Sequence, residues 1–251
     1  SLSGRFLLML KINGECYVLN DASGFRSAFY KKDGENAYIT SNINMLKYIE
    51  DIEIKECLED YLVSDHYLHT RTFMWHAGFT FHKGIHHLVP NHYLNCKDWK
   101  QIRFFPNKKT EIENDPVIID EIINKINRLL KSGIESVKNR HEIALALSAG
   151  NDSRVLLSLM KEYADKVHYW ISYNSKKEAD YFVPKKLLSS FGLKFHPIKN
   201  ISATKEFLRF YKNNTPMSHD FWSMYNYSVW CQYPEDKIVV RGAAAETARN
   251  Y

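Results

Sequence analysis

The fold is decided by residues 143–157, which read IALALSAGNDSRVLL. The first five residues are apolar and uncharged, which predicts a short buried strand. Six small or polar residues, 148–153, follow, and the apolar spacing from Val155 to Met160 then predicts a helix with a wide apolar face. A strand, a tight polar turn and a helix in this order place backbone amides and the positive end of a helix dipole at the turn, where a phosphate group can bind.

The residue types in this turn favour a phosphate that binds together with a divalent cation. Gly150 lets the backbone approach a ligand closely, and Ser148 and Ser153 offer hydroxyl donors. Asp152 would repel a phosphate unless a cation neutralised both, and Mg²⁺ commonly binds one or two carboxylates together with phosphate oxygens. The alternative is an ordinary connecting turn in which Asp152 only caps the helix, and the six residues by themselves leave it open.

Ser-Ala-Gly-Asn-Asp-Ser after an apolar strand resembles the Ser-Gly-Gly-x-Asp-Ser pyrophosphate-binding loop (PP-loop) of the ATP pyrophosphatases. The flanking chain narrows the resemblance to the asparagine synthetase family. The Gly-Lys-Ser/Thr of a Walker A loop is missing. The resemblance implies that this loop binds the pyrophosphate part of ATP, through residues Leu147, Ser148, Gly150, Asp152 and Ser153.

The amino-acid composition limits the classes of protein to which the chain can belong. The chain has 251 residues, 45% of them apolar and 25% charged, which is ordinary for a globular protein of one large or two modest domains. Lys and Arg are dispersed and the net charge of +5 is mild, so neither a nucleic-acid nor a membrane partner is expected, and the apolar runs are too short to span a bilayer. No secretory signal is apparent. The four cysteines form no Cys-x-x-Cys pair, which argues against zinc and fits a reduced cytoplasm.

Residues 1–110 predict a mostly β region. Asn13-Gly14 is a typical hairpin turn between an apolar strand and its return strand, and Asp33-Gly34 marks a second hairpin. The expected elements are strands at 5–10, 16–19, 27–30, 37–40, 84–90 and 93–95, the last two as a pair, and helices at 42–50 and 54–63.

Several short motifs in this region resemble the later half of the glutaminase domain of asparagine synthetases, an Ntn-type β-sandwich with helices. The family's nucleophile is an N-terminal Cys and its glutamine-binding residues lie upstream, so no glutaminase residue is assigned here. Cys16 lies inside a predicted strand, away from any activating α-amine. The motifs are Leu2-Ser3-Gly4-Arg5-Phe6; Asp21, Gly24 and Tyr30; Thr40-Ser41-Asn42; and Thr80 to Ile85 followed by Pro90-Asn91-His92.

Seven of the eleven histidines fall between His66 and His92. Their spacings fit neither a zinc pattern nor one face of a helix, so surface and loop histidines are the favoured interpretation over a metal site. They are His66, His69, His76, His82, His86, His87 and His92.

Residues 104–116 have the composition of a linker, which divides the chain into a glutaminase-like part at 1–110 and a synthetase-like part at 111–251. Asp115 and Pro116 predict the start of a long packing helix with a sustained apolar period. Strands and helices then alternate, which predicts an α/β domain with a mostly parallel sheet, similar to the adenine nucleotide α-hydrolase fold of the PP-loop enzymes. The expected strands are 143–147, 167–172, 195–198 and 237–241, and the expected helices are 154–164, 178–191, 204–213 and 219–231.

The carboxyl ends of parallel strands share one edge of a sheet, which groups residues 148–153 with 172–175 and 241–247. The resemblance implies that main-chain groups at Ser172 hold the adenine, with Trp170 or Tyr173 as packing, although a core position is favoured for Trp170.

The third segment resembles the family's Ser-Gly-Glu-Gly-Ser-Asp-Glu-Leu. This resemblance implies that Gly242 approaches the nucleotide and that Asp152 and Glu246 bind Mg²⁺. Ala243 departs from the family's Glu near the acyl-adenylate, and Ala149 departs from the second Gly of the loop. The family's later Lys would lie beyond Tyr251. Since the sequence starts at Ser1 rather than Met and ends directly after this motif, we expect that both ends are cut or that the sequence is part of a longer protein.

The resemblance implies a cytoplasmic ATP-dependent amide ligase of the asparagine synthase type. A small-molecule carboxylate would form an acyl-adenylate with release of pyrophosphate, and ammonia or another amine would displace AMP. A homodimer is compatible with it. Two alternatives stay open. The first is a non-catalytic or diverged homologue that binds nucleotide or a partner, which Ala243 favours. The second is a sulfur-transfer enzyme acting on tRNA, which would need a nearby catalytic Cys and a basic face.

Overall fold

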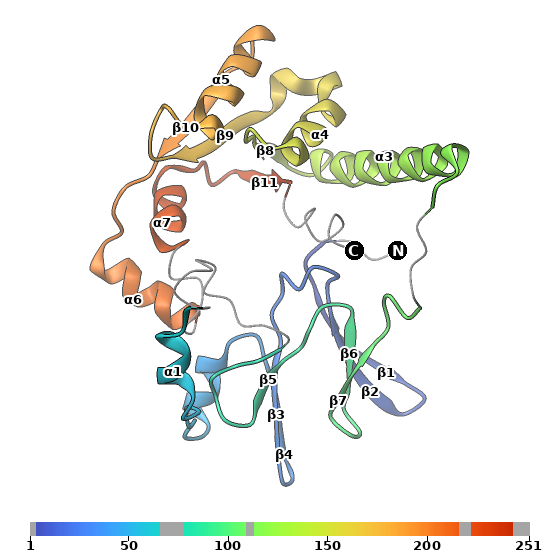
Figure 1. The fold of residues 1–251 in the computed structure, drawn as a ribbon, viewed down its shortest axis with the longest axis vertical. Coiled ribbons are helices and arrows are strands. Elements are labelled where there is room, and N and C mark those ends of the chain that lie inside the picture. Colours follow the sequence, from blue (N-terminus) through green and yellow to red (C-terminus); the bar gives the residue numbers. More distant parts are fainter. Residues whose placement is uncertain (1–3, 66–77, 109–112, 216–221, 243–251) are drawn as a thin grey trace. The chain divides into compact units, whose positions relative to one another are not determined.

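The structure, a computed structural model, describes residues 4–65, 78–108, 113–215 and 222–242. The chain forms two compact units, each considered by itself: residues 1–111 with 204–223, and residues 112–203 with 224–251. Both contain sheets, so the chain is a mixed α/β protein (Figure 1). Within the described ranges, no helix is both long enough and apolar enough to cross a membrane.

The first unit contains two antiparallel sheets. One has the order β1-β2-β6-β7 and the other β4-β3-β5. The predicted turn at Asn13-Gly14 is confirmed, since both residues have positive φ between β1 and β2, the geometry of a tight hairpin. The strands are β1 (Leu7–Ile12), β2 (Glu15–Asn20), β3 (Phe29–Asp33), β4 (Asn36–Thr40), β5 (Ile85–His87), β6 (His92–Asn95) and β7 (Lys100–Arg103).

Asp21 organises the turn that follows β2. Its buried carboxylate accepts the backbone N–H groups of Ser23, Phe25 and Arg26 at 3.2, 3.0 and 2.9 Å. Gly24 in the same turn has φ +65, and a Cβ there would lie 2.5 Å from the Pro90 side chain. The spacing of Asp21 and Gly24 therefore has a structural explanation, a tight turn packed against a loop distant in sequence.

Three expectations for the first unit are wrong. The strands at 84–90 and 93–95 do not pair with each other, because β5 pairs with β3 while β6 pairs with β2 and β7. The predicted helix at 54–63 is reduced to α1 (Leu58–Leu62), since Ile54 is extended and bridges to His82. His82 is not a surface histidine: it is buried, and burial lowers its pKa to about 4. The helix expected at 42–50 is the 3₁₀ helix η1 (Ile43–Tyr48).

The α6 helix (Lys205–Asn214) belongs to the first unit. The carbonyl oxygen of Asn213, near its end, accepts the side-chain amides of Asn42 and Asn44 at 3.3 and 2.6 Å. Thr204 caps its first turn by accepting the N–H of Phe207.

The second unit is built on a parallel sheet with the order β10-β9-β8-β11. All four strands were predicted from their short apolar runs, and each lies within two residues of its expected bounds. They are β8 (Glu142–Ala146), β9 (His168–Tyr173), β10 (Phe195–Lys199) and β11 (Lys237–Arg241). The chain moves outward from β8 to β9 and β10 and then returns to place β11 on the other side of β8.

Helices cover both faces of this sheet. Leu145 and Tyr169 point to one face, where they meet apolar side chains of α3 (Pro116–Lys138), α4 (Asn151–Leu159) and α5 (Ala179–Ser190). Ala144 and Trp170 point to the other face, against α7 (Ser223–Gln232). Since parallel sheets are normally covered on both faces, this arrangement explains why the strand sequences are apolar without alternation.

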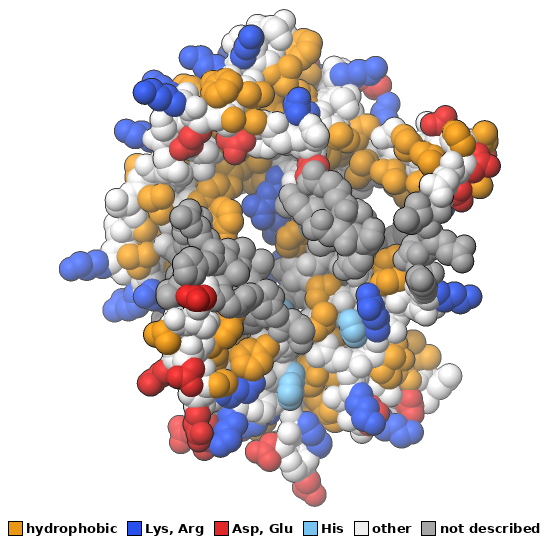
Figure 2. Space-filling view, viewed as in Figure 1, with side chains coloured by type: hydrophobic (Ala, Val, Ile, Leu, Met, Phe, Trp, Pro, Cys, Tyr) orange, Lys and Arg blue, Asp and Glu red, His pale blue; other side chains and the backbone are white. Residues whose placement is uncertain are grey.

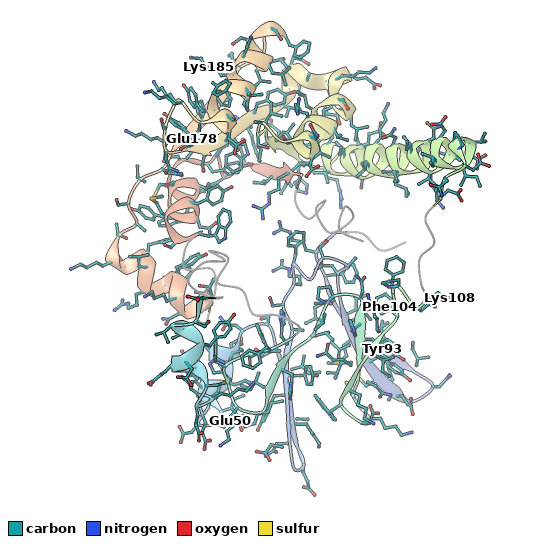
Figure 3. All side chains as sticks on the ribbon, in the orientation of Figure 1. Glu50, Tyr93, Phe104, Lys108, Glu178 and Lys185 are labelled. Atoms are coloured by element: carbon teal, nitrogen blue, oxygen red, sulfur yellow. The ribbon has the colours of Figure 1, made fainter. Side chains whose placement is uncertain are left out.

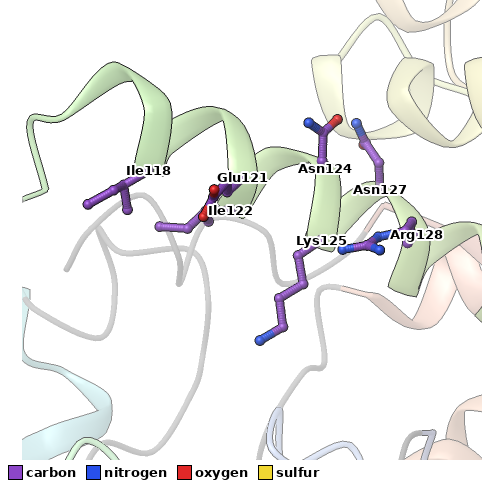
Figure 4. Close-up of a pocket in the computed structure, with 7 residues that line it drawn as sticks. All are labelled: Ile118, Glu121, Ile122, Asn124, Lys125, Asn127 and Arg128. Carbon is purple, nitrogen blue, oxygen red and sulfur yellow. The ribbon is translucent and has the colours of Figure 1, made fainter.

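The α3 helix packs through its C-terminal end. Asp115 caps its start by accepting the N–H of Val117 at 2.9 Å, as predicted, and Ile134 near its end is buried in the core of the sheet. Further upstream, among the described residues, the apolar stripe from Ile118 to Leu130 is at least 37% exposed. Figure 4 shows this part of the helix, with Asn124 and Asn127 pointing away from the side on which Lys125 lies. The expected packing helix is therefore observed over its last turns only.

The helix after β8 begins earlier than predicted. It starts at Asn151 rather than 154, so half of the expected loop forms its first turn, and it ends at Leu159, where the 3₁₀ helix η2 (Lys161–Lys166) follows. The connection between β8 and α4 consequently contains only residues 147–150.

Two histidines stack on adjacent strands of the parallel sheet. The ring centroids of His168 on β9 and His196 on β10 are 4.0 Å apart. Burial, followed by the positive charges of His196 and Lys237, lowers the pKa of His168 to about 4, while Asp236 opposes the shift. Burial, and then Lys194, also lowers the pKa of His196. The pair is therefore neutral in the folded protein.

We predict that this pair makes the protein less stable in acid. Between pH 6.5 and about 4 the unfolded chain binds more protons at His168 than the folded protein does, so the free energy of unfolding falls as the pH falls through this window. Urea unfolding at pH 7 and pH 5 should show a smaller loss for His168→Gln than for the wild type. An equal loss in both proteins would contradict the prediction.

Candidate functional site

The predicted loop lies where the order of the parallel sheet reverses. Strand β8 has β9 on one side and β11 on the other, and the chain reaches these neighbours in opposite directions. In open parallel sheets, ligands bind beyond the carboxyl ends of the strands at such a reversal. The connection from β8 to α4 and the end of β11 meet at this edge of the sheet.

Gly242 lies directly against the first turn of α4. A Cβ added to it would stand 2.7 Å from the backbone carbon and the Cβ of Asp152 and 2.9 Å from the Ser153 nitrogen. Only a residue without a side chain allows this approach. The structure thus brings Gly242 together with Asp152 and Ser153, as the sequence predicted.

The N-terminus of α4 has the features of an anion site. Its N-cap residue, Gly150, is extended at φ −71° and ψ 153°, and no side chain caps the helix there. The first amides of a helix lack intrahelical partners, and the helix dipole adds positive potential. Asp152 is half-buried in this first turn, so the same turn carries a carboxylate and the first amides of the helix. These features fit an anion that carries a divalent cation.

The two serines hold the loop together in this structure. The buried Ser153 hydroxyl accepts the N–H of Ser148 at 3.1 Å and lies 3.2 and 3.1 Å from the carbonyl oxygens of Ser148 and Gly150, to either of which it can donate. The Ser148 hydroxyl accepts the N–H of Gly150 at 3.1 Å and lies 3.1 Å from that of Ser153. These hydrogen bonds give the two hydroxyls an observed role in shaping the loop. Their predicted role, to donate hydrogen bonds to a phosphate, stays a prediction.

Asp180 belongs to this site and was missed by the sequence reasoning. It lies in the first turn of α5, and its Oδ1 accepts the N–H of Ala149 at 2.9 Å. An acidic residue in the first turn of a helix is usually interpreted through the helix dipole alone. The signal that could have identified it is topological, since α5 starts after the strand adjacent to β8 and so begins at the same edge of the sheet.

The predicted adenine segment lies at the end of β9. Ser172 is half-buried and stands opposite Ile198 in the sheet register. Trp170 is 1% exposed and packs edge-on against Tyr233, which confirms the core position favoured for it. Leu147 has a fully buried side chain, so only its backbone could contribute to a ligand site.

Glu246 and Ala243 lie outside the described residues, as do His66, His69 and His76. In the ranges that the structure describes, no group of three or more His, Cys, Asp or Glu side chains is placed to hold a metal ion. Two described histidines of the first unit contact aromatic rings: His87 stacks on Phe29, and His86 lies against Tyr30.

No protein-family model matches the chain, and no curated protein matches it either. The resemblance to the asparagine synthetase family therefore stays a prediction that rests on the motifs and on the geometry above.

We predict that Gly242→Ala destabilises the second unit and displaces the loop. The added Cβ would meet backbone atoms of Asp152 and Ser153 at less than 3.0 Å, and overpacking of this kind costs about 1–3 kcal/mol. Gly133→Ala is the matched control: a Cβ there meets nothing within 4 Å, and in a helix interior it should stabilise by about 0.5–1 kcal/mol. Chemical denaturation of both variants measures the difference, and equal stabilities would show that Gly242 does not approach α4.

Proposed function

We propose that the second unit binds Mg-ATP at the β8–α4 connection and catalyses the ATP-dependent activation of a carboxylate, as an amide ligase similar to asparagine synthetases. The carboxylate oxygen would attack the α-phosphorus, pyrophosphate would leave, and ammonia or another amine would displace AMP from the acyl-adenylate. The proposal includes an adenine nucleotide α-hydrolase-like fold for this unit.

The observation that carries the proposal is the contact between Gly242 and the first turn of α4. It joins two segments that lie about 90 residues apart and that separately resemble parts of one nucleotide site. The strand order β10-β9-β8-β11 supports it as well, because the reversal beside β8 is where such sheets bind nucleotides.

Each residue would have a defined part in this chemistry. The first amides of α4 would donate hydrogen bonds to phosphate oxygens, while Asp152 would bind the cation, with Glu246 as the second carboxylate that the resemblance implies. The cation would supply charge neutralisation for the leaving pyrophosphate. Main-chain groups at Ser172 would hold the adenine ring. Catalysis would then rest on positioning and charge stabilisation rather than on a protein nucleophile.

We predict that the protein binds Mg-ATP and that Asp152→Asn weakens this binding about tenfold or more, because the variant loses one cation ligand; a factor of ten corresponds to about 1.4 kcal/mol. Isothermal titration calorimetry measures the affinity. Asp165→Asn removes an exposed carboxylate from η2 in the same unit and should bind as the wild type does.

Carboxylate activation is measured separately, by the exchange of labelled pyrophosphate into ATP in the presence of candidate carboxylates. Exchange that depends on one carboxylate supports the ligase. Binding of Mg-ATP without exchange for any carboxylate would support the non-catalytic alternative, and a wild type that takes up no Mg-ATP would refute the site itself.

A further inference from the structure

Two of the four cysteines lie directly opposite each other on neighbouring strands of the first unit. The antiparallel register of β2 with β6 places Tyr17 opposite Asn95. One position further, Cys16 lies opposite Cys96, and the Cys96 N–H donates to the Cys16 carbonyl oxygen at 2.9 Å. The fold thus brings together two cysteines that are 80 positions apart in the sequence.

The pairing continues on the other side of the two cysteines. Lys97 Nζ donates to Glu15 Oε1 at 2.9 Å, which joins the next two opposite positions by an ion pair. The turn into β7 is fixed as well, since the Trp99 N–H donates to the Asn95 carbonyl oxygen at 2.8 Å. Observed cross-strand contacts therefore hold the two cysteines in register from both sides.

Both cysteine side chains point to the inward face of the sheet. Directly opposite residues of antiparallel strands share a face, and so do residues two positions apart on one strand. Val18 and Leu94, two positions from the cysteines, are buried, and Cys96 packs against the cluster that they form. On the other face, Tyr17 lies edge-on against Tyr93, which Figure 3 labels, with ring centroids 5.6 Å apart.

The two half-buried thiols are free and interact with each other. Burial, followed by a hydrogen bond with Cys16, raises the pKa of the Cys96 thiol to about 11. In a hydrogen-bonded antiparallel pair the Cα atoms lie about 5.5 Å apart, within the roughly 4.4–6.8 Å that a disulfide requires. The backbone therefore already has the spacing of a disulfide-linked pair.

We propose that Cys16 and Cys96 form a reversible redox site, which a small-molecule disulfide such as oxidised glutathione converts to a cross-strand disulfide. The thiolate of one cysteine attacks a sulfur of the small disulfide and expels the other half as a thiolate. The thiolate of the second cysteine attacks the mixed disulfide and expels the remaining half. Two cysteine thiols are oxidised, one small disulfide is reduced to two thiols, and the two cysteine protons pass to the leaving thiolates.

The disulfide would join the two central strands of the sheet β1-β2-β6-β7. It would close a long loop of chain and so restrict the unfolded state of the first unit. The other two cysteines, Cys57 and Cys231, are exposed, and a small disulfide can modify each of them by itself. The inference concerns the first unit and does not rest on the proposed nucleotide site.

The test uses the full chain with Cys57→Ser and Cys231→Ser, which remove the two exposed thiols. The folded protein is equilibrated in glutathione buffers of increasing oxidised fraction, quenched with acid and examined by mass spectrometry. We expect a product that is lighter by two hydrogens and carries no glutathione, and that dithiothreitol returns to the starting mass. A non-reducing peptide map of the oxidised wild type should link Cys16 to Cys96.

The matched control adds Cys96→Ser to the same chain, which leaves Cys16 without a neighbouring thiol. Half-modification of this control, as a mixed disulfide with glutathione, should need at least about tenfold more oxidised glutathione, because an intramolecular thiol has a high effective concentration. Cys96→Ala serves in its place if the serine variant does not fold. An equal requirement in both proteins, glutathione retained on the parent chain, or two free thiols in the parent chain at every oxidised fraction would overturn the proposal.

Discussion

The close approach of Gly242 to the first turn of α4 is the constraint on which the candidate site depends. Parallel pairing of β11 with β8 runs from Lys237 to Arg241, so the next residue must pass the start of the helix that follows β8. A side chain at that position would collide with Asp152. The absence of a Cβ lets two connections share one edge of the sheet.

The loop itself is held by short-range contacts of small residues. The Ser148 and Ser153 hydroxyls satisfy its internal amides, and Asp180 ties it to the neighbouring βα unit. A loop fixed in this way loses little conformational freedom when a ligand arrives, which is the property a preorganised electrostatic site requires.

Lysine and arginine side chains are scattered over the visible surface of the molecule rather than gathered in one patch (Figure 2).

The sequence was informative where structure follows from local pattern. Apolar runs located the four parallel strands, and Asp115 with Pro116 located the start of α3. It failed where tertiary contacts decide: a β-bridge to His82 shortens the helix expected at 54–63, and Asp180 reaches the loop from 31 positions away. The roles of Ser148 and Ser153 could not be separated from sequence either, since a hydroxyl that shapes a loop and one that binds phosphate look alike in a motif.

The charge of the loop bears on which class of ligand it suits. A module that only captures phosphate groups would be expected to place Lys or Arg against the helix end, since a cationic side chain adds to the dipole. Here Asp152 stands in the first turn of α4, and the Asp180 carboxylate accepts an amide of the loop. Carboxylates at an anion site are unfavourable unless a cation joins the ligand, so the same residues that weaken a simple phosphate-binding interpretation favour a metal–nucleotide complex. The two carboxylates at this loop, rather than the fold, are therefore the features that favour the nucleotide hypothesis over a general anion site.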